Sequence, residues 1–520
     1  MSYIEGIDRN QQTFWALEDL IPEESIVRVM DRFVETTDIA SMGFTRTQPA
    51  KTGRPGYAPE PLIKLYLYSY DNGIRSSRKL EKESKRNIEV MWLMQGLTPD
   101  HSSISEFRRL NATNLKKLFR EFVLLCKSWD LTGGDAIAQD GSKIGASNSH
   151  KNNVKKRGID KRIQSIDEKI AEHICGMDKT DENECGDVIN TPPVKELLKL
   201  LKLSKRKDQL DQCKQQMEEL GVDEVSMTDP DARMMGSPGK GFDIAYNMQI
   251  SVDSKHHIIL DCDVINNPTD RGEMTPMVKR LIEDEHIKPS EDTAYLADRG
   301  YYSGEDLAAL AELPINAIVP RQNPPHPKGQ PEIFWCTNFL YDITTDTYTC
   351  PMGHKLYPAK LRSSETKRIS YRNKDACKNC PHNKDCTRGK EEYRIIRRGE
   401  YADICDAADQ TYKANKTIYD LRRELVEHPF GTIKRHMNGS YFLLRTLPKV
   451  NGEAALFCLA YNIKRAFNVL GFKDIMLKLD ARIGKLRCFF FPRGVTRISS
   501  RFHWGLECYL RRAGGFFNVL

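Results

Sequence analysis

An α/β fold with one mixed sheet behind an N-terminal helical domain is predicted by three observations. Apolar residues recur at helical spacing through the first quarter of the chain. Strand-like alternation begins at about residue 135, and strand and helix patterns then alternate up to about residue 320. The chain has 520 residues, which suggests two to four domains, and 39% of them are hydrophobic, enough to build a buried core.

The first predicted domain, residues 1–128, is a small bundle of helices. A helix pattern runs from Glu24 to Thr37. After the basic turn KTGRPGYAPE, Pro61 opens another helix, at a position where a missing backbone N–H costs nothing. Asp100 precedes SISEFRRL as a helix cap. These signals predict a bundle in which a helix-turn-helix would fit.

DNA binding by this bundle is suggested by local charge and not by the bulk charge. The net charge of +7 is matched by residues 471–520, which hold ten Lys or Arg against three Asp or Glu, so the first 470 residues are close to neutral. Any DNA-binding surface must therefore come from local clusters, and we take Arg108 and Arg109 as DNA-binding residues. The alternative is an ordinary solvated bundle. The basic, aromatic tail at 471–520 is assigned no role.

Strand patterns place the first part of a sheet domain at residues 132–320. DAIAQDGSKIGA alternates and then ends in a polar turn, and FDIAYNMQISVD and HHIILDCDVIN follow it. Helix and strand then alternate through GEMTPMVKRLIEDE, TAYLADRGYYSG, EDLAALAEL and INAIVP. Three antiparallel-type strands followed by this alternation is the order of an RNase H-like sheet. Two charged helix patterns at 154–220 predict an inserted helical hairpin, which would serve as a spacer or a dimerisation arm.

A small cysteine-rich insertion is predicted at residues 321–400, and helices of the sheet domain return at 401–470. Five of the fourteen cysteines lie between residues 336 and 386. No secretory signal is apparent, so disulfides are not expected and a metal site is favoured. Two of these cysteines have the two-residue spacing that lets both sulfurs reach one Zn²⁺. The candidate ligands of a structural zinc ion are Cys350, Cys377, Cys380 and Cys386. The alternative is four reduced cysteines without metal.

Three carboxylates are the candidate catalytic residues. Asp140, in AQDGSK, and Asp298, in LADRGYY, each follow an apolar strand and precede a glycine-containing turn, and ligands gather at the carboxyl ends of strands. Glu427 lies in the late helix RRELVEHPFGTIKR, which Pro429 should bend or interrupt. Three converging carboxylates suit two Mg²⁺ ions about 3.5–4 Å apart, with Mn²⁺ as an alternative ion. Asp263 and Asp270, which also lie near strand ends, are the reserve carboxylates, the next candidates if one of these three is not catalytic.

At these residues the chain resembles the bacterial insertion-sequence DDE transposases, over roughly residues 15–470. The family's Arg-x3-Glu-x6-Lys pattern is present as Arg423, Glu427 and Lys434, and AQDGSK and ADRGYYSG resemble the two aspartate motifs. One position departs from the pattern: the family has Tyr three residues before the Arg, whereas position 420 is Asp and Tyr419 is its neighbour.

The resemblance implies an RNase H-like catalytic domain that cleaves DNA at the ends of an insertion sequence and transfers the strands to target DNA with Mg²⁺. Arg423 and Lys434 would then grip phosphates near the metals. We expect a homodimer or higher homo-oligomer on DNA, a cytoplasmic location and no membrane partner, because no apolar run approaches the ~20 residues needed to cross a bilayer. The alternatives are a metal-dependent nuclease that cuts without joining, and a DNA-binding protein whose catalytic site has decayed.

Overall fold

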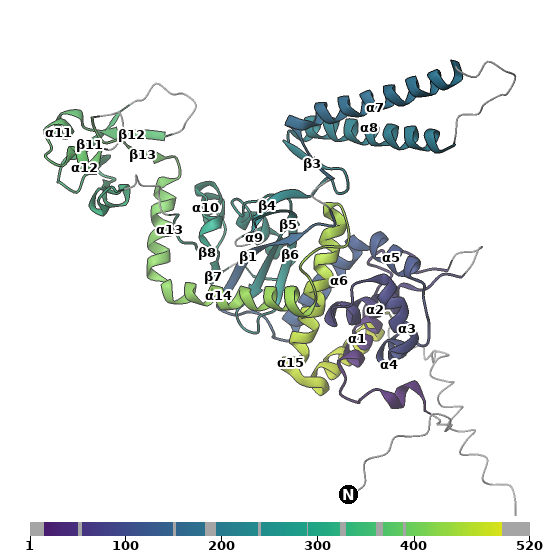
Figure 1. Cartoon of the computed structure of the whole chain (residues 1–520). Coiled ribbons are helices and arrows are strands. Elements are labelled where there is room, and N and C mark those ends of the chain that lie inside the picture. Colours follow the sequence, from purple (N-terminus) through teal and green to yellow (C-terminus); the bar gives the residue numbers. More distant parts are fainter. Residues whose placement is uncertain are drawn as a thin grey trace, which may run out of the picture.

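The mixed α/β architecture with a helical N-terminal region is confirmed. The computed structural model describes residues 15–49, 52, 55–148, 152–182, 194–237, 241–288, 290–322, 329–359, 368–387 and 392–490. Its central sheet carries helices around it, while a helical hairpin and a small β module project from the body (Figure 1). One hydrophobic core extends from Ile21 to Leu479, so the N-terminal helices and the sheet share the same buried interior.

The central sheet has the strand order β4-β5-β1-β7-β8, and β6 also pairs with β5. β1 is antiparallel to β5 and parallel to β7, and β7 is parallel to β8. β4 and β6 pair with successive parts of β5, both antiparallel. The strands are β1 (Ala136–Gly145), β4 (Arg233–Ser237), β5 (Gly241–Asp253), β6 (Ile259–Ile265), β7 (Ser290–Leu296) and β8 (Ile315–Ile318).

β1 is longer than its sequence pattern indicates. The pattern places Asp140 at the end of the strand, before a polar turn, but β1 pairs with β5 without interruption from Ile137 to Gly145. Asp140 stands opposite Ile250, in the middle of the strand, so the predicted strand end is wrong. The polar residues that follow Asp140 remain in the strand because β5 supplies hydrogen-bond partners for their backbone, a tertiary effect that local propensity does not contain.

The N-terminal helices begin and end near their predicted positions. Asp100 caps α5, accepting a hydrogen bond from the backbone N–H of Ser103 at 2.7 Å, as its place in the sequence predicts. α2 begins at Pro59, two residues before the predicted Pro61. The helices are α1 (Ile26–Glu35), α2 (Pro59–Asp71), α3 (Ser77–Arg86), α4 (Ile88–Leu93), α5 (His101–Leu110) and α6 (Ala112–Ser128), preceded by the short helix η1 (Leu17–Leu20).

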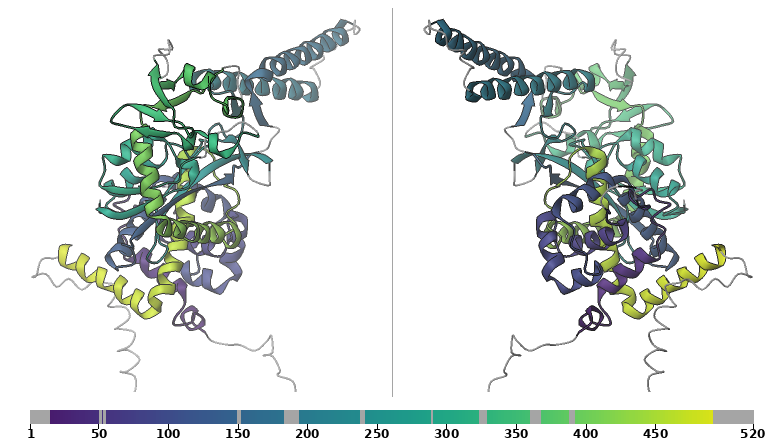
Figure 2. Two further views of the ribbon diagram at one scale, coloured as in Figure 1. Left: turned by 90° about the vertical axis from the view of Figure 1, so that its left-hand side faces the viewer. Right: turned by 90° about the vertical axis from the view of Figure 1, so that its right-hand side faces the viewer.

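The predicted helical hairpin is present between β1 and β4. It consists of α7 (Lys156–Glu182) and α8 (Val194–Leu220), and its base is the two-stranded sheet β2 (Asn153–Lys155) and β3 (Glu224–Ser226). The hairpin has a small core of its own, formed by Val154, Ile159, Ile166, Leu210, Cys213, Met217 and Val225. Both views of Figure 2 show it projecting from the end of the molecule opposite the bent part of α15. Part of the predicted acidic loop, at 183–187, lies outside the described residues.

The cysteine-rich insertion forms a separate antiparallel sheet of five short strands, in the order β13-β12-β11-β10-β9. Its own core consists of Phe339, Tyr348, Leu356, Tyr371 and Ile396. The strands are β9 (Leu340–Asp342), β10 (Thr347–Thr349), β11 (Lys355–Ala359), β12 (Arg368–Arg372) and β13 (Ile396–Gly399). The short helical elements here are η4 (Glu332–Phe334), η5 (Cys336–Asn338), α11 (Lys374–Lys378) and α12 (Asn383–Cys386).

The remaining helices surround the sheet. Pro429 lies within α14 without ending it, and a π-helical turn, η6, follows directly. α15 is kinked at Gly471, whose φ of 75° suits glycine. Residues 491–520 of the predicted tail lie outside the described residues, and no described helix is long and apolar enough to cross a membrane. The helices are α9 (Met274–Glu283), η3 (Arg299–Tyr301), α10 (Gly304–Ala311), α13 (Ala402–Ala414), α14 (Lys416–Gly431), η6 (Thr432–His436) and α15 (Leu447–Phe490).

Candidate active site

Asp140 and Asp298 come from neighbouring parallel strands. β1 carries Asp140, and it pairs with β7 so that Ala138 stands opposite Leu296. Asp298 follows β7 by two residues and caps η3, accepting a hydrogen bond from the backbone N–H of Gly300. Because the register places position 140 beside position 298, the two carboxylates project near the same edge of the sheet. Residues far apart in the chain are thus brought together as the sequence predicts.

The electrostatic surroundings of Asp140 are those of a crowded acidic site. Burial raises the pKa of Asp140 to about 6, and the charges of Asp298 and Asp270 add to this, while the Arg422 guanidinium acts in the opposite direction. Nη1 of Arg422 lies 3.7 Å from Oδ1 of Asp140. The ionised form of Asp140 is therefore unfavourable in this site unless a cation compensates it.

This crowding predicts that Asp140→Asn stabilises the metal-free protein at pH 7.5. The folded-state pKa lies above the ordinary value of 3.8. Ionised Asp140 therefore lowers the unfolding free energy. This loss of stability is fully present above about pH 6 and disappears as the pH falls towards 4. We expect a gain of the order of 1–3 kcal/mol in unfolding free energy at pH 7.5. Thermal melting in chelator at pH 7.5 and at pH 4.5 measures it; an equal change at both pH values would contradict this origin.

Glu427 is not brought to the two aspartates in this structure. Its side chain is 62% exposed, and Oε1 accepts a hydrogen bond from Nε of Arg423 at 2.7 Å, with Arg423 80% exposed. The outward direction of the Glu427 side chain follows from helix geometry. Arg422 faces Asp140, and a residue five positions later on an α-helix points about 140° away from it. Arg422 and Glu427 of one regular helix therefore cannot both face Asp140.

Tyr419, the neighbour of the departing position 420, lies beside the aspartates together with Arg422, to which the sequence assigned no role. The Arg422 guanidinium lies 6.0 Å from the centre of the Tyr419 ring. Burial raises the pKa of Tyr419, with Arg422 opposing and Asp298 adding to the rise, so the phenol also faces the acidic site. The sequence contained a signal for this pair. The family pattern has a tyrosine three residues before an arginine, and Tyr419 stands three residues before Arg422.

Lys434 lies at the edge of the same site. It comes from η6, its Nζ donates a hydrogen bond to Oγ of Ser142, and the same Nζ lies 5.7 Å from the centre of the Phe430 ring. Ser142 belongs to β1, two residues after Asp140. The π-helical turn thus places a cation at the strand of Asp140, two residues further along β1.

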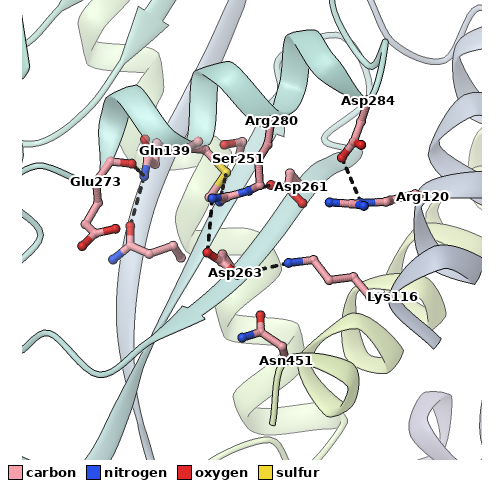
Figure 3. A network of polar contacts seen from close by, with 12 residues as sticks. Lys116, Arg120, Gln139, Ser251, Asp261, Asp263, Glu273, Arg280, Asp284 and Asn451 are labelled. Carbon is pink, nitrogen blue, oxygen red and sulfur yellow. Dashed lines mark hydrogen bonds and ion pairs between the residues drawn. The ribbon is translucent and has the colours of Figure 1, made fainter. Parts of the chain in front are cut away.

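The reserve carboxylates differ in what surrounds them. Asp263, on β6, lies 3.1 Å from Nζ of Lys116 and 3.3 Å from Nη1 of Arg280 (Figure 3). These ion pairs join α6, β6 and α9 and give Asp263 a structural role. Asp270, in the loop before α9, instead points at the site: it contributes to the raised pKa of Asp140, and Nζ of Lys143 lies 3.7 Å from its Oδ1.

Arg108 is a core residue, which corrects its prediction as a DNA-binding residue. Its side chain is 6% exposed, Nη1 donates to the Tyr70 hydroxyl at 3.0 Å, and the guanidinium lies 4.0 Å from Glu453. The apolar spacing of α5 places this position towards α2 and α15, so the charge is used inside the protein. Arg109, its neighbour, is 53% exposed and lies 3.6 Å from Glu106. The pattern of basic residues in the sequence did not show which of the two arginines is buried and which is exposed.

The four predicted zinc ligands line one small cavity of the cysteine module, together with His354. Burial raises the pKa of Cys386 to about 11, and the thiols of Cys377, Cys350 and Cys380 add to this, so the four sulfur atoms are within electrostatic reach of one another. Within the described residues, no three His, Cys, Asp or Glu side chains are arranged closely enough to hold a metal ion as they stand.

Two family models of transposase domains match the chain. One, a transposase domain (DUF772), matches residues 15–110, and the other, a transposase DDE domain, matches residues 349–467. The chain thus carries two separate matches to transposase domain models. The two matches support an insertion-sequence DDE transposase family and confirm the resemblance seen in the sequence. The second match includes the four predicted zinc ligands and Glu427, whereas Asp140 and Asp298 lie outside both.

A similar solved structure is the cryo-EM structure of a piggyBac transposase synaptic complex with hairpin DNA. It is 11% identical to this chain, covers 94% of this chain and 84% of its own, and has a TM-score of 0.26. None of the curated proteins compared with the chain matches it.

Proposed function

We propose that this chain binds the ends of an insertion sequence and cleaves and transfers DNA strands there with divalent metal ions. The observation that carries the proposal is the meeting of Asp140 and Asp298 at one edge of the sheet, in a chain with two transposase domain matches. The strand order also supports an RNase H-like catalytic domain: β1, β4, β5 and β6 form the antiparallel pairs, and the parallel strands β7 and β8 follow them in the chain.

Divalent metal ions fit the residues of this site. Asp140 and Asp298 supply hard oxygen ligands, and the raised pKa of Asp140 reflects negative charge that a cation would offset. When bound, Mg²⁺ ions would activate a water molecule or a 3′-hydroxyl and stabilise the leaving oxygen. Glu427 remains the proposed third catalytic residue from the family motif. To reach the aspartates it has to leave Arg423, and α14 has to turn so that Glu427 replaces Arg422 on the face towards Asp140. Mn²⁺ is the expected substitute ion.

The cations beside the site are the proposed phosphate contacts. Arg422, at Asp140, and Lys434, at Ser142, lie where the scissile phosphate would approach the carboxylates. Arg423 is the most exposed of the three and would hold a flanking phosphate. Arg109 remains a proposed contact from the N-terminal helices, whereas Arg108 does not. Transposition joins two element ends, so we further propose a homodimer or higher homo-oligomer on DNA.

A cleavage and joining assay tests the function. The purified full chain is incubated with Mg²⁺, a supercoiled plasmid and duplexes that contain the DNA flanking its gene on each side. We expect nicks at one position in each flank and covalently joined products. Duplexes of the same length from within the gene are the control. Nicks without joined products would favour the nuclease alternative, and specific binding without nicks would favour a decayed catalytic site.

We propose, separately, that Cys350, Cys377, Cys380 and Cys386 bind one structural zinc ion. The shared cavity and four soft thiol donors support it, and the short strands around them form only a small core. The purified protein should contain about one Zn²⁺ per chain, measured by mass spectrometry of the metal, and Cys380→Ser should lose it. Cys175→Ser, an exposed cysteine on α7, is the matched control. A folded, metal-free wild type would refute the site.

A further inference from the structure

The loop between β6 and α9 holds Asp270 in a fixed position against the sheet. Oδ1 of Asp270 accepts hydrogen bonds from Nδ2 of Asn247 at 2.6 Å and from Nε2 of Gln249 at 2.8 Å. Both amides come from the buried strand β5, which lies beside β1. Two charge-assisted hydrogen bonds from the side chains of buried residues orient the carboxylate.

The other carboxylate oxygen lies near the turn that carries Asp298. An ideal Cβ placed on Gly300 would lie 3.6 Å from Oδ2 of Asp270 and 2.9 Å from Oδ1 of Asp298, so both oxygens surround the same point. On the other side, a Cβ on Gly141 would lie 2.6 Å from Oδ1 of Asp270. Two glycines therefore leave the space in which Asp270 approaches the strand of Asp140 and the turn of Asp298.

An independent observation indicates a ligand here. Oδ1 of Asn247 is buried and has no hydrogen-bond partner among the described residues, and it would lie 2.9 Å from a Cβ on Gly141. The orientation of this amide is set, because its Nδ2 donates to Asp270. A buried carbonyl oxygen without a donor is costly. A cation, or a water molecule bound to one, satisfies such an oxygen beside carboxylates.

We propose that Asp270 is a metal-binding residue of the Asp140 and Asp298 site, held in position by Asn247 and Gln249. The inference rests on the proposed metal dependence and adds a residue outside the DDE motif. Asp270 would thus supply a carboxylate beside Asp140 and Asp298 while Glu427 is bonded to Arg423, although the three carboxylates have to draw closer together around a bound ion. Asn247 and Gln249 are positioning residues, since they act through Asp270.

Mn²⁺ binding to the full chain without DNA tests the proposal, measured as free Mn²⁺ by electron paramagnetic resonance at pH 7.5. Asp270→Asn should weaken binding at least about tenfold, as Asp140→Asn does, and Asn247→Ala by about tenfold or more. Asp270→Asn keeps an oxygen that can accept both amide hydrogen bonds, so the fold should be retained. Asp292→Asn removes one exposed carboxylate at the start of β7 and should stay within about twofold of wild type.

Gly141→Ala provides a second variant that keeps every carboxylate. Its methyl group would displace Asp270, so Mn²⁺ binding should weaken here too. Wild-type affinity in Asp270→Asn, with binding lost in Asp140→Asn, would overturn the role of Asp270 and leave the proposed function standing. Absence of Mn²⁺ binding by the wild type would instead overturn the metal dependence itself, and the Asp270 proposal with it.

Discussion

Asp140→Ala is expected to lower the rate of DNA strand cleavage by about three orders of magnitude or more, equivalent to roughly 4 kcal/mol of lost transition-state stabilisation. The carboxylate lies in the middle of β1, near Asp298 and Arg422, where the pairing of β1 with β5 fixes its position. Asp298→Ala and Glu427→Ala should lose cleavage to a similar degree. Single-turnover cleavage of the flanking-DNA duplexes with Mg²⁺ provides the measurement.

Binding of the same duplexes should change little in these three variants, since the metals serve chemistry more than affinity. A gel-shift titration at a stated salt concentration checks this point. Asp292→Ala, at the exposed start of β7, is the matched control and should cleave as wild type does. If Glu427→Ala cleaves normally while the two aspartate variants do not, the family motif has been carried to the wrong residue, and Asp270 is the next carboxylate to test.

Glu453→Gln is expected to cost about 3–5 kcal/mol of stability, because it breaks a buried ion pair. Glu453 is fully buried, and Oε1 lies 2.6 Å from Nη2 of Arg75 and 4.0 Å from Nη1 of Arg108. Its Oε2 accepts the backbone N–H groups of Leu443 and Leu444 at 2.9 and 2.8 Å. Burial acts to raise the pKa of Glu453, but Arg108 and Arg75 hold it below its usual value. The variant leaves two buried guanidinium groups without a charge partner.

Thermal unfolding measures this loss of stability, and we expect the melting temperature of the main transition to fall by several degrees. Arg109→Ala serves as the control, because it removes an exposed arginine next to Arg108 and should change stability by no more than about 0.5 kcal/mol. A Glu453→Gln variant as stable as wild type would show that the network contributes nothing net. Since Arg75 also donates to the backbone carbonyl of Asn438 at 2.6 Å, the loop after η6 should loosen as well.

Much of the architecture could be predicted from local chemistry. Asp100 caps α5 because its side chain is suited to the free N–H groups of a helix start. The two charged helix patterns at 154–220 form the hairpin because each helix has only a narrow apolar stripe. The order of strand patterns predicted the mixed sheet. The pairing of Asp140 with Asp298 was also predictable, since both follow apolar strand patterns that adjoin in such a sheet.

The direction of each charged side chain was decided only by tertiary structure. Arg108 and Arg109 are neighbours with the same chemistry, but Arg108 faces Glu453 in the core while Arg109 faces solvent. Arg422, and not Glu427, faces Asp140, because the packing of α14 against β1 turns one face of the helix towards the strand. Asp270 acquires its place only when β5 brings Asn247 and Gln249 beside it. A sequence determines which residues are charged and how each segment folds, whereas the packing of segments distant in the chain determines which charges meet.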